Sequence, residues 1–211
     1  MNRVYRYLPL LFCIPFAYAQ SALDVNLGFG TVHNKAADGG IDSSTGASCT
    51  TGTTCLRTPS LSGFFMGFGG TIMASKRFGF SGEATLQPRK QDYAGFQSRQ
   101  IFYDVNAVFA PVNEKKVMVR LEGGIGGATT SFSYTASSCV GTAVCQSQSQ
   151  AVGSSKHFQI HAGAGVQLYL NEHVFIRPQF DLHYVPNFTN QCGSSMAPGA
   201  MVWIGYSVGD R

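Results

Sequence analysis

Apolar and polar residues alternate strictly between residues 157 and 184. On both sides of a short turn at 171–173, the residues between the apolar ones are mainly Gly, Gln, Arg, Asp and His. The apolar set is Phe158, Ile160, Ala162, Ala164, Val166, Leu168, Leu170, Val174, Ile176, Pro178, Phe180, Leu182 and Tyr184. A period of two indicates strands rather than a helix, and these run to about twice the ~5–6 residues of an average strand. One apolar face and one face with charged groups are typical of transmembrane β-strands.

Six further segments alternate in the same way: 23–31, 61–73, 78–87, 98–110, 117–134 and 197–208. Together with the two strands of the hairpin, they predict eight strands. We expect tight turns near residues 75, 113 and 171, and longer polar loops at 32–59, 90–96, 135–155 and 186–196. In lipid every backbone polar group must be paired, so such a sheet must close. We therefore predict an all-β fold, an eight-stranded antiparallel up-and-down transmembrane β-barrel. Its short turns should face the periplasm and its long loops the outside of the cell.

The first residues of the chain have the three parts of a secretory signal peptide. Arg3 and Arg6 form a basic region, residues 8–16 are apolar, and Ala17-Tyr18-Ala19 is a small-x-small cleavage site. The apolar run is too short to span a bilayer core of ~30 Å as a helix. We expect residues 1–19 to be removed and residues 20–211 to form one outer-membrane domain.

Composition agrees with a lipid-facing barrel. Charged residues make up only 12% of the chain, while 25 glycines, 16 phenylalanines and 9 tyrosines are present. Few charges with many glycines and aromatic residues suit a barrel whose outside faces lipid. A net charge of +4 gives no argument for nucleic acid as a partner.

Two pairs of cysteines lie in loops rich in Ser, Thr and Gly. Five residues separate Cys49 from Cys55 and Cys139 from Cys145. A zinc site needs about four ligands at suitable spacing, and neither pair encloses a histidine, so no metal and no cofactor are expected. In an exported protein, two local disulfides that close the loop tips are the better interpretation. Cys192 is left over; it is either free or a sign that the pairing differs.

The inward faces of the predicted strands carry ionisable side chains at similar depths. Because a charge shielded from water needs a partner, we predict an arginine–carboxylate network centred on Arg120 and Arg177. Its predicted members are Glu83, Asp104, Arg120, Glu122, His161, Arg177, Asp181 and His183. The network either plugs the lumen or lines a narrow path, in which the excess of acids would favour cations.

The chain resembles the small outer-membrane barrels of OmpA type, in particular their eight-stranded transmembrane domain. In the last strand, Gly199, Val202 and Ile204 resemble the Gly-x-x-apolar-x-apolar signal that the barrel assembly machinery reads. These barrels commonly end on an aromatic residue, whereas this chain runs past Tyr206 to Asp210-Arg211. The resemblance covers the whole mature chain without a peptidoglycan-binding domain. It implies a location in the bacterial outer membrane, among its lipids and lipopolysaccharide.

The resemblance implies fold and location more than activity, so several functions stay open. The pattern favours a structural or surface-interaction role, adhesin-like, with a cell-surface ligand as partner. One alternative is a narrow cation-preferring channel or small-solute pore. Another is a lipid-modifying enzyme, because some similar barrels are deacylases in which a serine follows the catalytic histidine by two positions. Here Val185 stands two positions after His183, and no enzyme is expected.

Overall fold

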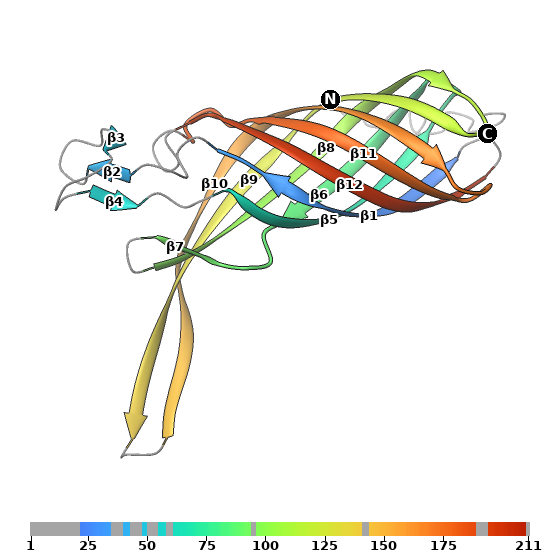
Figure 1. The fold of residues 1–211 in the computed structure, drawn as a ribbon. Helices are drawn as coiled ribbons and strands as arrows, with labels where there is room; N and C mark the ends of the chain where they lie inside the picture. Colours follow the sequence, from blue (N-terminus) through green and yellow to red (C-terminus); the bar gives the residue numbers. More distant parts are fainter. Residues whose placement is uncertain are drawn as a thin grey trace, which may run out of the picture.

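Eight strands close into an antiparallel ring in the computed structural model (Figure 1). The structure describes residues 22–34, 40–42, 48–49, 55–57, 61–93, 96–140, 144–188 and 194–209. The ring strands are β1 (Leu23–Val32), β5 (Gly63–Met73), β6 (Phe78–Leu86), β8 (Phe96–Asn113), β9 (Val117–Val140), β10 (Val144–Tyr169), β11 (Val174–Tyr184) and β12 (Met196–Val208). Each strand pairs with the next in this order, and β12 pairs with β1 to close the ring. The predicted fold class is confirmed.

The two ends of the barrel differ in their connections. At one end lie the turns at 74–77, 114–116 and 170–173, together with the first and last described residues of the ring. At the other end, β2 (Gly40–Asp42), β3 (Ser48–Cys49) and β4 (Cys55–Arg57) form a small sheet, and β7 (Gln91–Tyr93) pairs with β8. The short turns thus lie together at one end, as the sequence predicts, and that end is the one expected to face the periplasm.

One predicted loop is wrong, because residues 135–140 and 144–155 continue as strand. The β9–β10 ladder extends from Val117 opposite Leu168 to Val140 opposite Val144, with one register shift between Ala151 and Gly153. This segment is rich in Ser, Thr and Gln and has no apolar period, so its hydrophobic pattern does not reveal it. We call residues 134–140 and 144–155 the surface ribbon; it stands out from the barrel in Figure 1.

The end of β8 also differs from the prediction. A strand was expected to end at residue 110 before a turn near residue 113, but β8 continues to Asn113 through a register shift between Phe109 and Val112. Pro111 lies inside this irregularity, where a residue without a backbone N–H is tolerated. The chain therefore reverses later, at 114–116.

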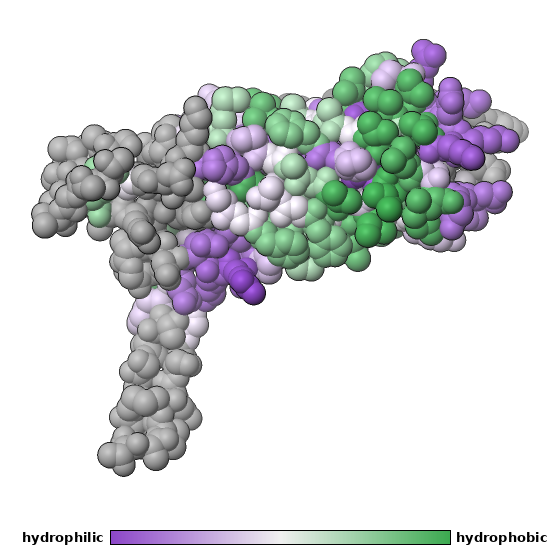
Figure 2. Space-filling view, viewed as in Figure 1, coloured by the Kyte–Doolittle hydropathy of each residue, from purple (hydrophilic) through white to green (hydrophobic). Residues whose placement is uncertain are grey.

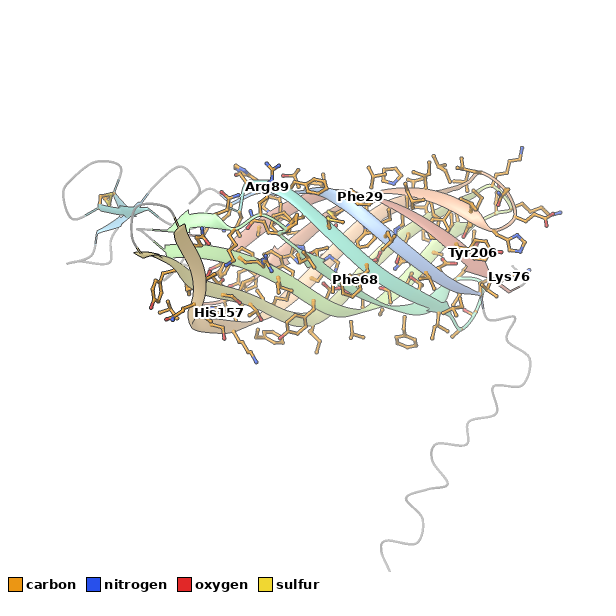
Figure 3. The ribbon with its side chains drawn as sticks, turned by 90° about the horizontal axis from the view of Figure 1, so that it is seen from below. Phe29, Phe68, Lys76, Arg89, His157 and Tyr206 are labelled. Atoms are coloured by element: carbon orange, nitrogen blue, oxygen red, sulfur yellow. A yellow bond between two sulfur atoms is a disulfide. The ribbon has the colours of Figure 1, made fainter. Side chains whose placement is uncertain are left out.

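The wall of the barrel has an apolar outside and a polar or small-residue inside. Burial alternates at nearly every position of β1 and β12, as a period of two requires. Apolar side chains cover much of the wall in Figure 2, and hydrophilic ones gather at the short-turn end. Figure 3 shows Phe29 and Phe68 on the wall and Lys76 at that end; both phenylalanines are exposed. The predicted outward and inward faces are confirmed.

Several expectations fall on residues that the structure does not describe. The signal peptide at 1–19 and Cys192 lie outside the described residues, so both stay predictions. Within the described ranges, no helix is long and apolar enough to cross a membrane.

Candidate functional site

The interior of the barrel is organised in three layers. Near the short turns lies an apolar cluster, the periplasmic plug: Ala22, Met73, Val108, Ala110, Met118, Tyr169 and Phe175. Toward the long loops lies a second, the outer plug: Val32, Leu61, Phe65, Phe102, Ala128, Val185, Phe188, Ala197, Met201 and Trp203. Between them, the inward faces of the strands carry a buried polar layer. The polar layer is therefore covered by apolar side chains toward both ends.

Glu83 on β6 joins the two buried arginines of the polar layer. Its Oε1 accepts a hydrogen bond from Arg177 Nη2 at 2.7 Å and lies 3.6 Å from Arg120 Nη2. Arg120 also donates from Nε to Glu122 Oε1 at 2.5 Å and from Nη1 to Thr71 Oγ1 at 2.7 Å. Both guanidinium groups are fully buried, and these contacts replace part of the water that the charges lose. Arg120 Nη2 and Arg177 Nε and Nη1 have no hydrogen-bond partner among the described residues.

Gln179 extends the network from Glu83 toward the outer plug. Its Nε2 donates to Glu83 Oε2 at 3.2 Å and to Asp181 Oδ1 at 2.7 Å. Asp181 Oδ1 in turn lies 3.2 Å from His161 Nε2. The network is thus continuous from β5 to β11, and seven of the eight predicted members belong to it.

His161 faces oxygen atoms at both ring nitrogens. Nδ1 lies 2.9 Å from Asn106 Oδ1 and 3.5 Å from Asp104 Oδ1, on the side opposite Asp181. Asn106 donates from Nδ2 to Asp104 Oδ1 at 2.5 Å, which fixes the orientation of its amide. His161 therefore links the carboxylates of β8 and β11 across the lumen.

His183 is the predicted member that the structure leaves outside the hydrogen-bonded network. Its ring stacks between Phe102 and His161, with centroid separations of 4.7 and 4.9 Å. Its Nδ1 is buried and has no hydrogen-bond partner among the described residues. With His161 and Asp104, however, it forms a group whose ligand-type atoms all lie within 4.8 Å of one another.

Two glycines on β9 allow these side chains to meet. Gly124 lies between Asn106 on β8 and His161 on β10 in the sheet, and Gly126 lies between Asp104 and Gln159. A Cβ at Gly124 would collide with Asn106, and one at Gly126 with the β8 backbone. Across this bare strand, Gln159 Nε2 reaches Asp104 Oδ2 at 3.3 Å.

Reasoning from the sequence missed the uncharged members of the network. Thr71, Ser81, Asn106, Gln159 and Gln179 each hydrogen-bond a charged member. All lie on the inward face, so the alternation alone could have found them. The metal expectation concerned only the cysteine pairs, and it did not consider the lumen histidines.

The disulfide predictions have different outcomes. Cys49 and Cys55 form a disulfide that joins β3 to β4, as predicted. Cys139 and Cys145 lie directly opposite each other in the β9–β10 ladder, but their side chains lie outside the described part of the chain. The second bridge stays a prediction.

Comparison with known proteins identifies the barrel. The family described as outer membrane protein beta-barrel domain matches residues 8–191. The chain belongs to this family. The family places the protein in the bacterial outer membrane and confirms the predicted resemblance to eight-stranded barrels of OmpA type. No curated protein sequence matches the chain.

Solved structures share the fold at low sequence identity. Ail, the attachment invasion locus protein of Yersinia pestis, in complex with the heparin analogue sucrose octasulfate, is 13% identical. The match covers 90% of this chain and 100% of that chain, with a TM-score of 0.51. The N-terminal β-barrel domain of Pseudomonas aeruginosa OprF is 11% identical over 90% and 100% of the two chains, with a TM-score of 0.47. At such identities, the likeness to Ail shows the fold alone.

Proposed function

We propose that this barrel is closed to solutes and acts at the cell surface through its surface ribbon. The length of β9 and β10 is the observation that carries this proposal. They contain 24 and 26 residues, whereas a transmembrane β-strand needs ~9–11. The excess on both strands lies at the outer end, so it serves no purpose in spanning the bilayer.

The surface ribbon offers backbone edges to a partner. The last pairing of β9 with β8 joins Ser133 to Gln97, and β10 pairs with β11 only from Ile160 onward. Among the described strands, those of the ribbon therefore have only each other as neighbours. Free strand edges can accept an added strand from another chain. Between Tyr134 and Lys156 the sequence has no charged residue, so recognition there would depend on backbone pairing and packing.

Deleting the tip of the ribbon tests this role. Bacteria that display the chain should attach to a layer of immobilised unfolded protein, which offers extended segments, more than to a polysaccharide layer. Removal of residues 136–148 should abolish the difference, while the heat-modifiable gel mobility of the barrel stays unchanged. The matched control replaces the periplasmic residue Lys115 with Gln and should attach normally. Attachment that persists without the ribbon would contradict the proposed role.

Lipopolysaccharide is the lipid partner that the outer end of the wall fits best. Lys90 reaches Ser133 and Ser149 at 2.8 and 2.9 Å, and so stays beside the base of the ribbon. Arg99 lies opposite Ser131 and Lys156 opposite Thr129, all on the outward face. We infer that these cations meet lipid phosphates, because arginine and lysine bind phosphate by charge-assisted hydrogen bonds.

An enzymatic role has one observation in its favour. Ser155 Oγ and His157 Nε2 lie 2.7 Å apart on β10, near the end opposite Lys76 (Figure 3), and acyl transfer by serine needs such a contact. His183, the histidine considered from the sequence, instead packs against two rings, and Val185 is fully buried. An unchanged lipid A mass after expression of the chain would support the non-enzymatic role. Loss of an acyl chain from lipid A, if Ser155→Ala prevents it, would instead identify the chain as a deacylase.

A further inference from the structure

Three ligand-type side chains converge in the buried polar layer. Asp104, His161 and His183 come from β8, β10 and β11, and each offers a ligand atom within 4.8 Å of the others. They are 7%, 2% and 4% exposed, so water competes little for them. Two imidazoles and one carboxylate are a donor set of borderline divalent metals such as Zn²⁺ and Cu²⁺.

The backbone register explains the convergence. His161 lies directly opposite His183 in the β10–β11 ladder. Asp104 lies on β8, two strands from β10, and its side chain is the inward one next to Asn106. On β9 between them, Gly124 and Gly126 have no side chain that would separate β8 from β10. The three side chains are therefore placed by the rigid wall of the barrel and not by a loop, as a preformed binding site requires.

His161 is oriented as a metal-bound histidine would be. Its Nε2 faces the Asp181 carboxylate at 3.2 Å, and Asp181 is itself held by Gln179 at 2.7 Å. Donation of Nε2–H to a carboxylate commonly orients histidine ligands. Nδ1 lies on the Asp104 side, 2.9 Å from Asn106 Oδ1 and 3.5 Å from Asp104 Oδ1. Because the Asn106 amide turns its oxygen toward Nδ1, a metal ion bound there replaces the Nδ1 proton and the contact with Asn106.

His183 and the charge balance supply independent support. A buried ring nitrogen without a partner, such as His183 Nδ1, is costly and calls for an explanation. The described lumen also buries five carboxylates (Asp24, Glu83, Asp104, Glu122 and Asp181) against Arg120, Arg177 and His161, whose ring nitrogens both face oxygen acceptors. A divalent cation in place of the His161 Nδ1 proton would reduce the remaining excess of negative charge.

We propose that Asp104, His161 and His183 bind one divalent transition-metal ion of the Zn²⁺ type inside the barrel. The ion ties β8, β10 and β11 together between the two apolar plugs. Binding requires the stacked rings to tilt, since donors around a tetrahedral Zn²⁺ lie roughly 3.3 Å apart for bond lengths of ~2.0–2.1 Å. This inference is independent of the surface ribbon and of its partner.

Metal analysis of the refolded barrel tests the site. Because both ends of the lumen are plugged, Zn²⁺ is added before refolding in detergent, and free metal is then removed on a desalting column. We expect one Zn²⁺ per barrel, and a Cu²⁺-loaded sample should show two imidazole nitrogens by electron paramagnetic resonance. His183→Phe, which keeps a ring between Phe102 and His161, and Asp104→Asn should each lose the ion while keeping heat-modifiable mobility.

A histidine outside the cluster provides the control. His173 lies in a periplasmic turn, where its ring stacks on Tyr206, and His173→Ala should retain one Zn²⁺. The proposal is overturned if the wild-type barrel binds no metal. It is also overturned if folded His183→Phe and Asp104→Asn barrels bind metal as the wild type does, or if His173→Ala loses it.

Discussion

Glu83 is the residue on which the two buried arginines depend together. Its Oε1 accepts a hydrogen bond from Arg177 Nη2 at 2.7 Å. The same oxygen lies 3.6 Å from Arg120 Nη2. Arg177 also lies over the ring of Trp203, 5.3 Å from its centroid, in the range of a cation–π contact. Removing the Glu83 charge would leave two guanidinium groups without part of their compensation, away from water.

Glu83→Gln should therefore destabilise the barrel strongly. We expect its free energy of unfolding to fall by ~3–5 kcal/mol, the usual cost of breaking a buried ion pair from one side. Urea unfolding in detergent can be followed by the fluorescence of Trp203, the chain's single tryptophan, which is fully buried. Glu114→Gln, in an exposed turn, is the matched control. A Glu83→Gln barrel as stable as this control would show that the network contributes little.

Glycines on the inward faces of β1 and β5 make room for large side chains of other strands. Gly28 and Gly67 both face the ring of Trp203, and a Cβ at either position would lie 2.6 Å from a ring carbon. Trp203 is rigid and has no exposed surface, so it cannot move aside cheaply. Gly123 on the outward face of β9 has no heavy atom within 4 Å of a Cβ built there.

The same substitution should therefore have different effects on the two faces. Gly67→Ala should lower the free energy of unfolding by ~1–3 kcal/mol, the usual cost of overpacking, and should shift the emission of Trp203. Gly123→Ala should change the free energy of unfolding by no more than ~0.5 kcal/mol. Equal losses in urea unfolding of the two variants would contradict the assignment of inward and outward faces.

The whole barrel contains two apolar plugs separated by a layer of paired charges. An ion would have to pass Phe175 and Met118 at one end and Phe65 and Trp203 at the other, all of which are buried. Desolvation at apolar constrictions is itself a barrier to ions. All three layers, and not the salt bridges alone, therefore support the closed lumen that we propose.

Planar-bilayer recordings should show no stable current through the refolded barrel. A general porin refolded in the same detergent serves as the positive control for insertion. A steady cation-selective current that Glu122→Gln reduces would instead identify the polar layer as a conducting path, because Glu122 is a central carboxylate of that layer.

What could be predicted from the sequence depended on local periodicity. Strand alternation determined the ring of strands, their faces and the inward position of Arg120, Arg177 and their acids, because lipid forces a period of two on each strand by itself. The surface ribbon escaped prediction because, outside the bilayer, no apolar face is needed and its backbone ladder leaves no mark on hydropathy. The Cys49–Cys55 bridge followed from short spacing in the chain.

The sequence by itself determined which side chains enter the lumen, since that depends only on odd or even position along a strand. Only the tertiary structure decided which of them touch. Arg120 reaches Thr71 and Arg177 reaches Glu83 across the barrel, and these meetings depend on strand register, closure of the ring and bare glycines at 124 and 126. The convergence of Asp104, His161 and His183 has the same origin, because three strands must be set side by side before their side chains share one space.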